Sequence, residues 1–402
     1  MTWMPEEYVR LRLDKGEAYV RKDSQDQLKR VDAVIFDCDG VLVDIRESYN
    51  KTISKTVAYI LEALVGWAIP ESMISDDLIF LFRKTGGFNN DWDTVYGILM
   101  FILCLLPLSR LQQLARIART LSEQPDPFIR LPSIKRVQGS DGESRRLDDK
   151  FLRKLGDELR EFTRLLDMTG VNSVDKNLER ALGPSRGVVR SLKGFFRDRS
   201  GVGEGIIATV FEEFFCGSQL FLETHKIRPR FYEGKGMIEN EKVIVRPESL
   251  DQLVSIFGKP NLGIASGSNI EPARYVLKDI LGRFDPKSLV FLDRMKESER
   301  ELLKDGAVEL SLEKPNPFSL LKASEAFESF TFVVYVGDSM EDVAMADAAA
   351  KSNSRFLSAG VYGHSHPQNE IIRCFLESGC DLVFSSVNEL PLILGKLRAE
   401  KN

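Results

Sequence analysis

Short runs of apolar residues recur along the chain, and stretches that suit helices separate them. The runs lie at residues 34–36, 262–265, 289–292, 332–336 and 382–384. Stretches such as IEPARYVLKDILGRF and PFSLLKASEAFESF have helical composition and lie between the runs. Short β-rich runs that alternate with helices are typical of parallel strands covered on both faces. The pattern predicts an α/β fold with a doubly wound parallel sheet.

This alternation is interrupted between the first and the second run. The intervening residues include DDKFLRKLGDELREFTRLLDM, in which apolar residues recur at helical spacing. We therefore predict a mostly helical domain at residues 46–258, inserted into an α/β domain formed by residues 31–45 and 259–402. Residues 1–30 are expected to form an N-terminal extension, either a helix on the core or an exposed arm.

Three stretches inside the insertion differ in composition from its amphipathic helices. Residues 122–146 are rich in Pro, Gly, Ser and charge, which predicts a long loop; residues 201–205, around GVGEG, predict a second break. Residues 94–108 carry no charge, but they fall short of the roughly 20 residues needed to span a bilayer and include Pro107. We expect them to form a buried helix.

Composition narrows the class of protein. The 402 residues, 43% of them hydrophobic and 29% charged, are enough for a sizeable core. A net charge of -5 gives no electrostatic reason to expect nucleic acid as a partner. The five cysteines show no CxxC pairing, so neither a zinc site nor a disulfide framework is predicted. The first residues lack the apolar core of a signal peptide. We expect a cytoplasmic protein without a nucleic-acid or membrane partner.

Polar residues follow or lie close to the ends of several apolar runs. They are Asp37, Asp39, Ser266, Lys314, Asp338 and Asp342. Ligands of open parallel sheets bind beyond the carboxyl ends of the strands, so these residues are expected to converge on one cleft.

Carboxylates gathered in one cleft repel each other unless a cation lies among them. Oxygen ligands without a nearby histidine favour Mg²⁺ over zinc or copper. Taken alone, DCDG also fits an acidic turn, but not a calcium loop, which has its glycine at the sixth position, whereas Gly40 is at the fourth.

The four clusters, in this order, resemble the four motifs of the haloacid dehalogenase (HAD) superfamily of phosphotransferases. The matching segments are DCDGVLVD (37–44), Ser266 after an apolar strand, Lys314 in EKPNP, and GDSMED (337–342). The resemblance covers about residues 30–50 and 230–395.

This resemblance implies a role for each acidic residue. Asp37 resembles the nucleophile that forms an aspartyl-phosphate, and Asp39 resembles the general acid and base. Because dehalogenases lack the second aspartate, Asp39 points to phosphate esters. Asp338, the Asp37 carboxylate and the Asp39 backbone carbonyl would bind Mg²⁺. Asp342 would lie in the outer shell of that site or pair with a lysine.

The same resemblance implies that Ser266, the Gly267 amide and Lys314 bind the phosphoryl group. Simpler interpretations remain open: Ser266 as a helix cap, Lys314 as a surface lysine and Asp338 as a turn residue. Cys38 is expected to pack away from the site.

An insertion directly after the first motif resembles the C1-type cap of this superfamily, although it is larger than in many members. The segments DIRESYNKTI, RKTGGFNNDWD and FFCGSQLFLETHKIRPRFYEGKGMIENE resemble subfamily IA phosphatase-like proteins. Within the second segment we predict substrate-specificity residues: Lys84, Asn89, Asn90, Asp91 and Trp92. A plain interhelical loop with a buried Trp is the alternative.

These observations lead to one functional hypothesis with two alternatives. We expect a Mg²⁺-dependent phosphatase that acts on a small phosphorylated metabolite resembling phosphoglycolate or a sugar phosphate. The alternatives are a phosphomutase and a non-catalytic binding or scaffold protein. His225, His364 and His366 are expected to be structural.

Overall fold

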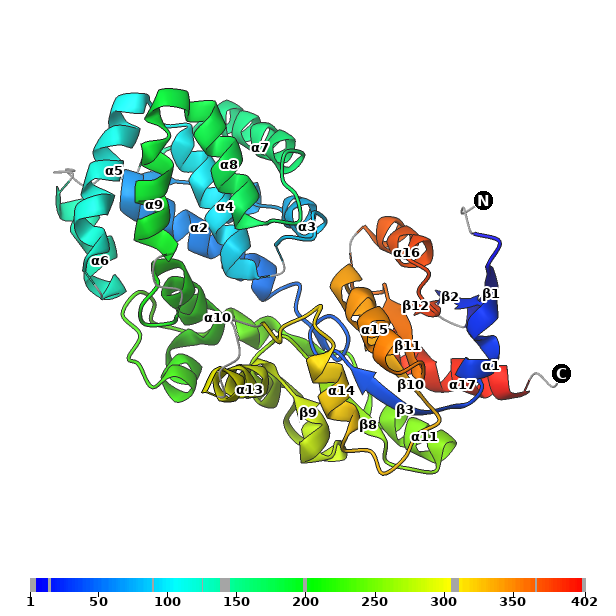
Figure 1. Cartoon of the computed structure of the whole chain (residues 1–402). Coiled ribbons are helices and arrows are strands. Elements are labelled where there is room, and N and C mark those ends of the chain that lie inside the picture. Colours follow the sequence, from blue (N-terminus) through cyan, green and yellow to red (C-terminus); the bar gives the residue numbers. More distant parts are fainter. Residues whose placement is uncertain are drawn as a thin grey trace. The chain divides into compact units, whose positions relative to one another are not determined.

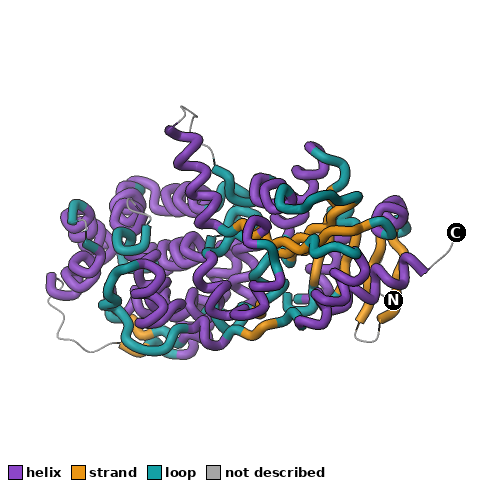
Figure 2. Tube along the Cα trace, turned by 90° about the horizontal axis from the view of Figure 1, so that it is seen from below, coloured by secondary structure: helices purple, strands orange, loops and turns teal. Residues whose placement is uncertain are grey.

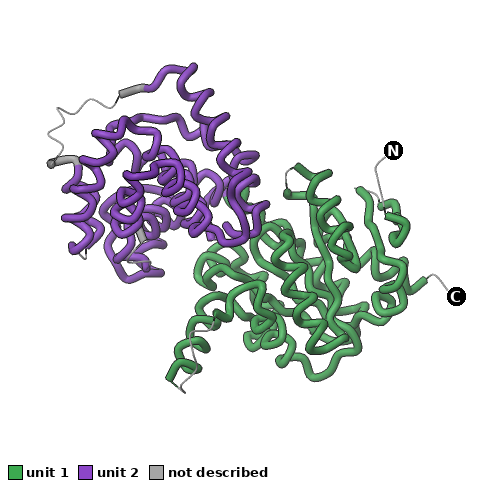
Figure 3. Tube along the Cα trace, turned by 45° about the horizontal axis from the view of Figure 1, so that its top comes forward, with its two compact units in different colours: residues 1–46, 241–402 green, residues 47–240 purple. Residues whose placement is uncertain are grey.

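The computed structural model describes residues 5–13, 16–88, 90–124, 126–137, 145–197, 201–304, 311–365 and 367–399. The chain forms two compact units (Figure 3). Unit 1 consists of residues 1–46 and 241–402, and unit 2 consists of residues 47–240. Residues 241–258, which the sequence analysis assigned to the insertion, belong to unit 1.

Unit 1 is built around an eight-stranded sheet (Figure 1). The strand order is β1(Tyr8–Leu13), β2(Gly16–Arg21), β12(Leu382–Phe384), β11(Phe356–Val361), β10(Phe332–Gly337), β3(Val31–Phe36), β8(Leu262–Ala265) and β9(Leu289–Val290). The strands from β12 to β9 pair in parallel. The predicted fold class, a doubly wound α/β sheet with a helical insertion, is therefore confirmed.

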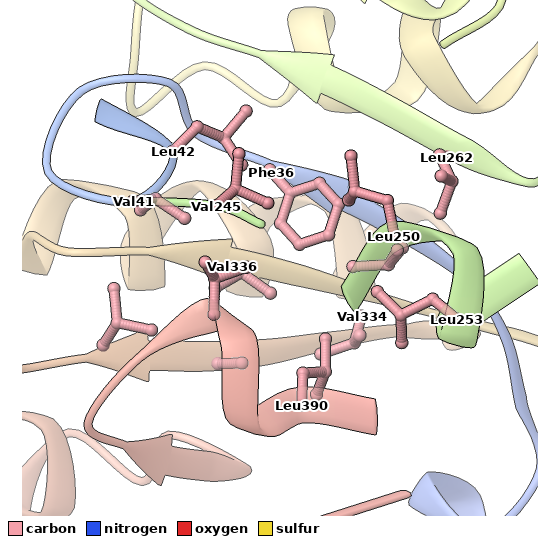
Figure 4. Close-up of a cluster of buried hydrophobic side chains, with 14 of the residues drawn as sticks. Phe36, Val41, Leu42, Val245, Leu250, Leu253, Leu262, Val334, Val336 and Leu390 are labelled. Atoms are coloured by element: carbon pink, nitrogen blue, oxygen red, sulfur yellow. The ribbon is translucent and has the colours of Figure 1, made fainter. Parts of the chain in front are cut away.

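Strand β3 lies in the interior of this sheet, and helices cover both of its faces. Successive side chains of a strand point to opposite faces. Val34 and Phe36 accordingly join one hydrophobic cluster, whereas Ala33 and Ile35 join another. Figure 4 shows Phe36 among the labelled residues of the first cluster. Burial on both faces explains why this strand has an uninterrupted apolar sequence.

The two clusters are completed by different helices. The cluster that contains Phe36 includes residues of α11(Pro247–Phe257), α12(Ile270–Leu277) and α17(Leu390–Ala399). The cluster that contains Ile35 includes residues of α13(Leu292–Lys304), α14(Phe318–Ser324) and α15(Met340–Ser352). Helices α1(Gln25–Leu28) and α16(Gln368–Glu377) also belong to unit 1.

The N-terminal residues extend the sheet, so the expectation of a helix or an exposed arm is wrong. Strands β1 and β2 form an antiparallel pair, and β2 pairs antiparallel with β12. Ala18 and Val20 are fully buried, and the Tyr8 hydroxyl donates a 2.7 Å hydrogen bond to the Cys380 carbonyl. The apolar alternation in this segment was too short and too mixed with charge to stand out. Strand β11 was also absent from the predicted runs, because it contains Ser358, Ala359 and Gly360.

The two ends of the insertion lie side by side in unit 1. Strand β4(Val43–Asp44) pairs antiparallel with β7(Lys242–Val243). The chain therefore leaves unit 1 and returns to it at one place, which allows a long insertion without disturbing the sheet.

Unit 2 is mostly helical, as Figure 2 shows by colour. Its helices are α2(Tyr49–Val65), α3(Asp76–Arg83), α4(Asp91–Cys104), α5(Leu108–Ser122), α6(Pro127–Val137), α7(Asp149–Thr163), α8(Val171–Leu182), α9(Gly187–Arg197) and α10(Ile206–His225). The two short strands β5(Trp67–Ala68) and β6(Arg145–Arg146) pair with each other.

Two predictions within unit 2 have opposite outcomes. Helix α4 is buried along most of its length, as expected. No helix among the described residues combines the length and apolarity that a membrane crossing requires. The loop predicted at residues 122–146 is wrong in part, because α6 occupies 127–137. Leu131 and Ile134 are buried one turn apart and hold this helix despite Pro132, which suggested a loop.

Candidate active site

Asp37 directly follows β3 and continues its pairing with β10. Its amide donates a 2.8 Å hydrogen bond to the Val336 carbonyl, which fixes the backbone at the carboxyl end of the strand. The side chain is 9% exposed. Its Oδ1 accepts a 2.7 Å hydrogen bond from the Cys38 amide, and its Oδ2 lies 2.8 Å from Lys314 Nζ. The carboxylate is thus fixed at the sheet edge.

A tight turn follows Asp37 and contains Asp39. The amides of Leu42 and Val43 both donate to the Cys38 carbonyl, at 2.8 and 3.0 Å. Asp39 is partly exposed, whereas Cys38 belongs to the hydrophobic cluster of Phe36. Burial raises the pKa of the Cys38 thiol well above its ordinary value. Cys38 therefore packs away from the carboxylates, as expected.

Gly40 brings this turn against Asp338. Its φ of 75° lies in the left-handed region that favours glycine. A Cβ built at position 40 would overlap the Asp338 carboxylate. The fourth position of DCDG is therefore occupied by glycine because Asp338, at the end of β10, lies directly beside it.

Asp342 is held by hydrogen bonds at both of its carboxylate oxygens. Oδ2 accepts from the Asp338 and Ser339 amides at 3.2 and 3.0 Å, and from the Ser339 hydroxyl at 2.7 Å. Ser339 and Asp342 form a capping box at the start of α15. Oδ1 accepts from the Tyr335 hydroxyl at 2.8 Å and lies 2.6 Å from Lys314 Nζ. Both carboxylate oxygens of Asp342 therefore have partners within the protein.

Lys314 lies between two carboxylates and is not a surface lysine. Its side chain is 8% exposed, and Nζ reaches both Asp37 and Asp342. Burial alone would lower the pKa of Lys314, but the charges of Asp342 and Asp37 outweigh burial and raise that pKa well above its ordinary value. The lysine is therefore a buried cation.

The two carboxylates beside Lys314 differ in acidity. Burial raises the pKa of Asp37, an effect that Lys314 opposes and the charge of Asp342 reinforces. Burial acts in the same direction on Asp342, but Lys314, Ser339 and Tyr335 outweigh burial and lower the pKa of that group. Asp342 is thus the fixed anion of the group. The pKa of Asp37, by contrast, depends on which charges lie beside its carboxylate.

Ser266 and Gly267 lie at the end of β8, the strand next to β3. The Ser266 amide donates to the Val290 carbonyl at 3.0 Å. Its buried hydroxyl hydrogen-bonds to Asp37 and so, like Lys314, opposes the rise in the pKa of Asp37 that burial causes. Helix α12 begins further on, with Asn269 as its N-cap residue, so Ser266 is not its cap. Gly267 is exposed, and a Cβ there would meet nothing within 4 Å. The space at this strand end is open.

The acidic side chains are suited to a cation. One oxygen each from Asp37, Asp338 and Asp342 lies within 4.8 Å of the others. An all-oxygen donor set suits Mg²⁺. Asp342 already accepts hydrogen bonds from two backbone amides and two hydroxyls and pairs with Lys314, more contacts than Asp37 makes, so Asp37 and Asp338 are the better ligands of this group.

The residues predicted for specificity lie in unit 2, around the connection between α3 and α4. Lys84 is exposed directly after α3. Asn90 is the N-cap of α4 and accepts a 2.8 Å hydrogen bond from the Trp92 amide, while Asp91 pairs with Arg83 at 2.8 Å. Asn89 lies outside the described residues. The fully buried aromatic of this connection is Phe88, and Trp92 is partly buried.

Sequence reasoning did not identify Tyr335 or Ser339 as members of the site. Tyr335 lies within an apolar strand and there resembles a core residue, although its hydroxyl binds Asp342. The available signal for Ser339 was a serine three residues before Asp342, the spacing of a capping box. Among the histidines, His364 Nδ1 lies 3.3 Å from Asp44 Oδ2, and His366 lies outside the described residues.

Comparisons with known proteins give information on the fold. No family model matches the sequence, and no curated protein matches it either. An X-ray structure from the Northeast Structural Genomics Consortium is similar over 92% of this chain and 100% of its own, with a TM-score of 0.61 and 19% identity. Phosphatase Tt82 from Thermococcus thioreducens matches over 86% of this chain and 98% of its own, with a TM-score of 0.46 and 18% identity. The first likeness supports the α/β fold with a helical insertion.

Proposed function

We propose that the chain is a Mg²⁺-dependent phosphatase of the HAD type that hydrolyses a small phosphomonoester. The observation that carries this proposal is the arrangement of Asp37, Lys314 and Asp342 at the carboxyl ends of β3 and β10. In this arrangement the Asp37 carboxylate, at the end of an interior strand, pairs with the buried cation Lys314. Asp338 lies close to the carboxylates of Asp37 and Asp342.

The proposed first step forms an aspartyl-phosphate. An Asp37 oxygen attacks phosphorus while the bond from phosphorus to the substrate oxygen breaks, and Asp39 donates a proton to that leaving oxygen. Asp39 suits proton transfer because it is partly exposed and thus accessible to substrate and water.

In the second step Asp39 regains the proton that it donated in the first. The Asp39 carboxylate takes a proton from water, whose oxygen attacks the phosphorus of the aspartyl-phosphate. The bond between phosphorus and Asp37 then breaks, which releases inorganic phosphate and regenerates the carboxylate. Lys314 and the Ser266 hydroxyl stabilise the negative charge of the phosphoryl oxygens in both steps.

The cation in this proposal is Mg²⁺, held by the carboxylates of Asp37 and Asp338 and the Asp39 carbonyl. When bound, it supplies positive charge that reduces the repulsion between the phosphoryl group and Asp37. Asp342 acts indirectly, because its hydrogen bonds to the Asp338 and Ser339 amides orient the turn that carries Asp338.

The proposal predicts phosphate release from a panel of phosphomonoesters, including phosphoglycolate and sugar phosphates. The wild type should release phosphate only with Mg²⁺, and Asp37→Asn should be inactive. Asp279→Asn is the matched control, because Asp279 is an exposed aspartate of unit 1. Equal release by wild type and Asp37→Asn would overturn the proposal. Phosphate transfer within a sugar phosphate without net release would instead identify a phosphomutase.

A further inference from the structure

Three side chains of α10 form a second cluster of metal-binding type, in unit 2. Glu212, Cys216 and His225 each offer one ligand atom, and these atoms all lie within 4.8 Å of one another. Cys216 Sγ lies 3.6 Å from Glu212 Oε2, and His225 Nε2 lies 3.5 Å from the same oxygen. Unlike the acidic group of unit 1, this cluster combines sulfur, nitrogen and oxygen.

These separations suit one tetrahedral ion. Zn²⁺ binds thiolate sulfur at about 2.3 Å and imidazole nitrogen or carboxylate oxygen at about 2.0 Å, so neighbouring ligand atoms lie about 3.3–3.5 Å apart. The observed separation of 3.5 Å between His225 Nε2 and Glu212 Oε2 lies at the upper end of this range, and that of 3.6 Å between Cys216 Sγ and Glu212 Oε2 lies just above it. A small side-chain adjustment would therefore complete three of the four positions of a zinc site.

His225 provides an independent observation. Its Nε2 atom is shielded from solvent and makes no hydrogen bond within the described part of the chain. A buried imidazole nitrogen without a hydrogen bond carries an energetic cost that a bound metal ion would remove. The side chains of His225 and Glu212 are 14% and 12% exposed, and Cys216 is 4% exposed. The cluster is therefore largely dry but close enough to the surface for an ion to enter.

The backbone of α10 brings these residues together. A straight helix rises about 1.5 Å per residue, so it would separate Glu212 from His225 by about 20 Å along its axis. The helix is broken at Gly217, where φ is 71° and ψ is 174°. Glu212 and Cys216 lie one turn apart before this break, and His225 lies after it. The break at Gly217 therefore allows His225 to approach Glu212 and Cys216.

Glycine is required at the break because another segment passes close to it. A Cβ at Gly217 would overlap the backbone of Gly236, and a Cβ at Gly236 would overlap the backbone of Cys216. Buried Glu213, next to Glu212, accepts hydrogen bonds from the amides of residues 230–232. The break in α10 at Gly217 is therefore part of the packed structure of unit 2.

We propose that Glu212, Cys216 and His225 bind one Zn²⁺ ion, with a water molecule as the fourth ligand. Thiolate and imidazole ligands favour Zn²⁺ and exclude Mg²⁺ as the preferred ion. The Cys216 thiol proton passes to solvent when the sulfur–zinc bond forms. The ion links the two halves of α10 across Gly217, and we expect it to stabilise unit 2. The sequence did not reveal this site because its ligands lack the close spacing of zinc motifs.

The proposal is tested on the full-length protein by competition for Zn²⁺ against a chromophoric chelator, in excess Mg²⁺ so that the acidic site of unit 1 is occupied. The wild type should bind one equivalent of Zn²⁺ and unfold at a higher temperature with it. Cys216→Ala and His225→Gln should each bind Zn²⁺ about 100-fold more weakly and lose the thermal shift. Substitution with Co²⁺ should give thiolate-to-metal absorption in the wild type and none in Cys216→Ala.

Two controls separate this site from other sources of binding. Cys104→Ala removes another cysteine of unit 2 that lies outside the cluster, and should bind Zn²⁺ like the wild type. Asp338→Asn should also bind one equivalent of Zn²⁺, because the proposed zinc site does not lie in unit 1. If Cys216→Ala does not fold, His225→Gln at the helix end carries the test. The proposal would be overturned if the wild type took up no stoichiometric Zn²⁺, or if both ligand variants took up Zn²⁺ as tightly as the wild type.

Discussion

Gly40 and Asp338 lie so close together that a single methyl group at position 40 would overlap the Asp338 carboxylate. The two residues come from distant parts of the sequence, one from the turn after β3 and the other from the end of β10. Because these strands are neighbours in the sheet, the glycine of the first motif and the aspartate of the last define one wall of the candidate site.

Gly40→Ala should abolish activity and lower the free energy of unfolding by about 2 kcal/mol or more, because it combines a strained φ with this overlap. Gly258→Ala is the matched control: Gly258 has a φ of 68°, but a Cβ there would meet nothing within 4 Å. We expect the control to lose about 1 kcal/mol and to retain activity. Chemical denaturation and phosphate release measure the two effects. An active Gly40→Ala variant would contradict the proposed position of Asp338.

Lys314→Met tests the buried cation between Asp37 and Asp342. Removing one partner of a buried ion network leaves uncompensated charge, which typically costs about 3–5 kcal/mol. The variant should be inactive, and Mg²⁺ should stabilise it more than the wild type, because the ion then offsets two carboxylates that have lost their lysine. Thermal unfolding across a Mg²⁺ titration measures this difference.

Lys322→Met provides the comparison, since Lys322 pairs with Glu325 on the exposed surface of α14. The stability of Lys322→Met should differ from that of the wild type by less than about 1 kcal/mol. Mg²⁺ should stabilise this variant as much as it stabilises the wild type. If Lys314→Met is as stable as this control, Lys314 does not compensate the two carboxylates.

The sequence predicted those parts of the structure that depend on local pattern. The apolar runs at β3, β8, β10 and β12 identified buried parallel strands because each is a continuous hydrophobic segment. Strand β11 was missed since small residues at its centre, such as Gly360, carry little β propensity. A Cβ at Gly360 would overlap the Phe375 ring, so this residue is set by tertiary packing that a single sequence does not show.

The candidate site follows the same division. Asp37 follows a strand, Lys314 lies in a Pro-rich turn, and Asp342 lies in the first turn of the helix after β10, where polar residues close to apolar runs are visible in the sequence. Tyr335 could not be predicted, because only the fold brings its hydroxyl within reach of both Asp342 and the Ala265 carbonyl. Likewise, His225 joins Cys216 only because helix α10 is broken at Gly217.

Tyr335→Phe tests whether this hydroxyl positions Asp342. The hydroxyl donates to Asp342 Oδ1 at 2.8 Å and is also 3.1 Å from the Ala265 carbonyl, and the residue is fully buried. Its loss should cost about 1–2 kcal/mol of stability and reduce activity less than Asp37→Asn does. Tyr275→Phe on the exposed surface of α12 should change neither quantity. Unchanged stability of Tyr335→Phe would show that the hydrogen bond is not needed to hold Asp342.

Variants at Asn90 and Trp92 test the proposed specificity segment. If this connection contacts substrate, Asn90→Ala and Trp92→Ala should change the ratio of kcat/KM between two phosphomonoesters more than the rate with a small generic ester. Asn90→Ala also removes a helix cap, at a cost of about 1 kcal/mol. Ser75→Ala removes the cap of α3 and thus controls for lost stability alone. If Asn90→Ala and Trp92→Ala both leave the substrate ratio unchanged, the specificity role should be abandoned.

Asp44 should make unit 1 sensitive to acid. Burial alone would raise the pKa of Asp44, but Arg46, with hydrogen bonds at 2.7 and 2.9 Å, and His364 lower it to about 2. A carboxylate whose pKa is lower in the folded state stabilises the protein above its unfolded pKa of about 4, and this stabilisation is lost as the pH falls through the folded value. After allowance for solvent screening, we expect about 1 kcal/mol at neutral pH.

Asp44→Asn should therefore lower the calorimetric melting temperature of unit 1 by about 2–4 °C at pH 7. The difference from the wild type should persist down to about pH 5 and shrink steadily below pH 4, because protonation then removes the same charge from the wild type. Asp157→Asn is the control, since the Asp157 side chain is 80% exposed on α7 and makes one distant contact with Arg160. A melting-temperature difference for Asp44→Asn that stays constant from pH 7 to pH 3 would show that the loss comes from packing. It would then not come from the charge that Arg46 and His364 stabilise.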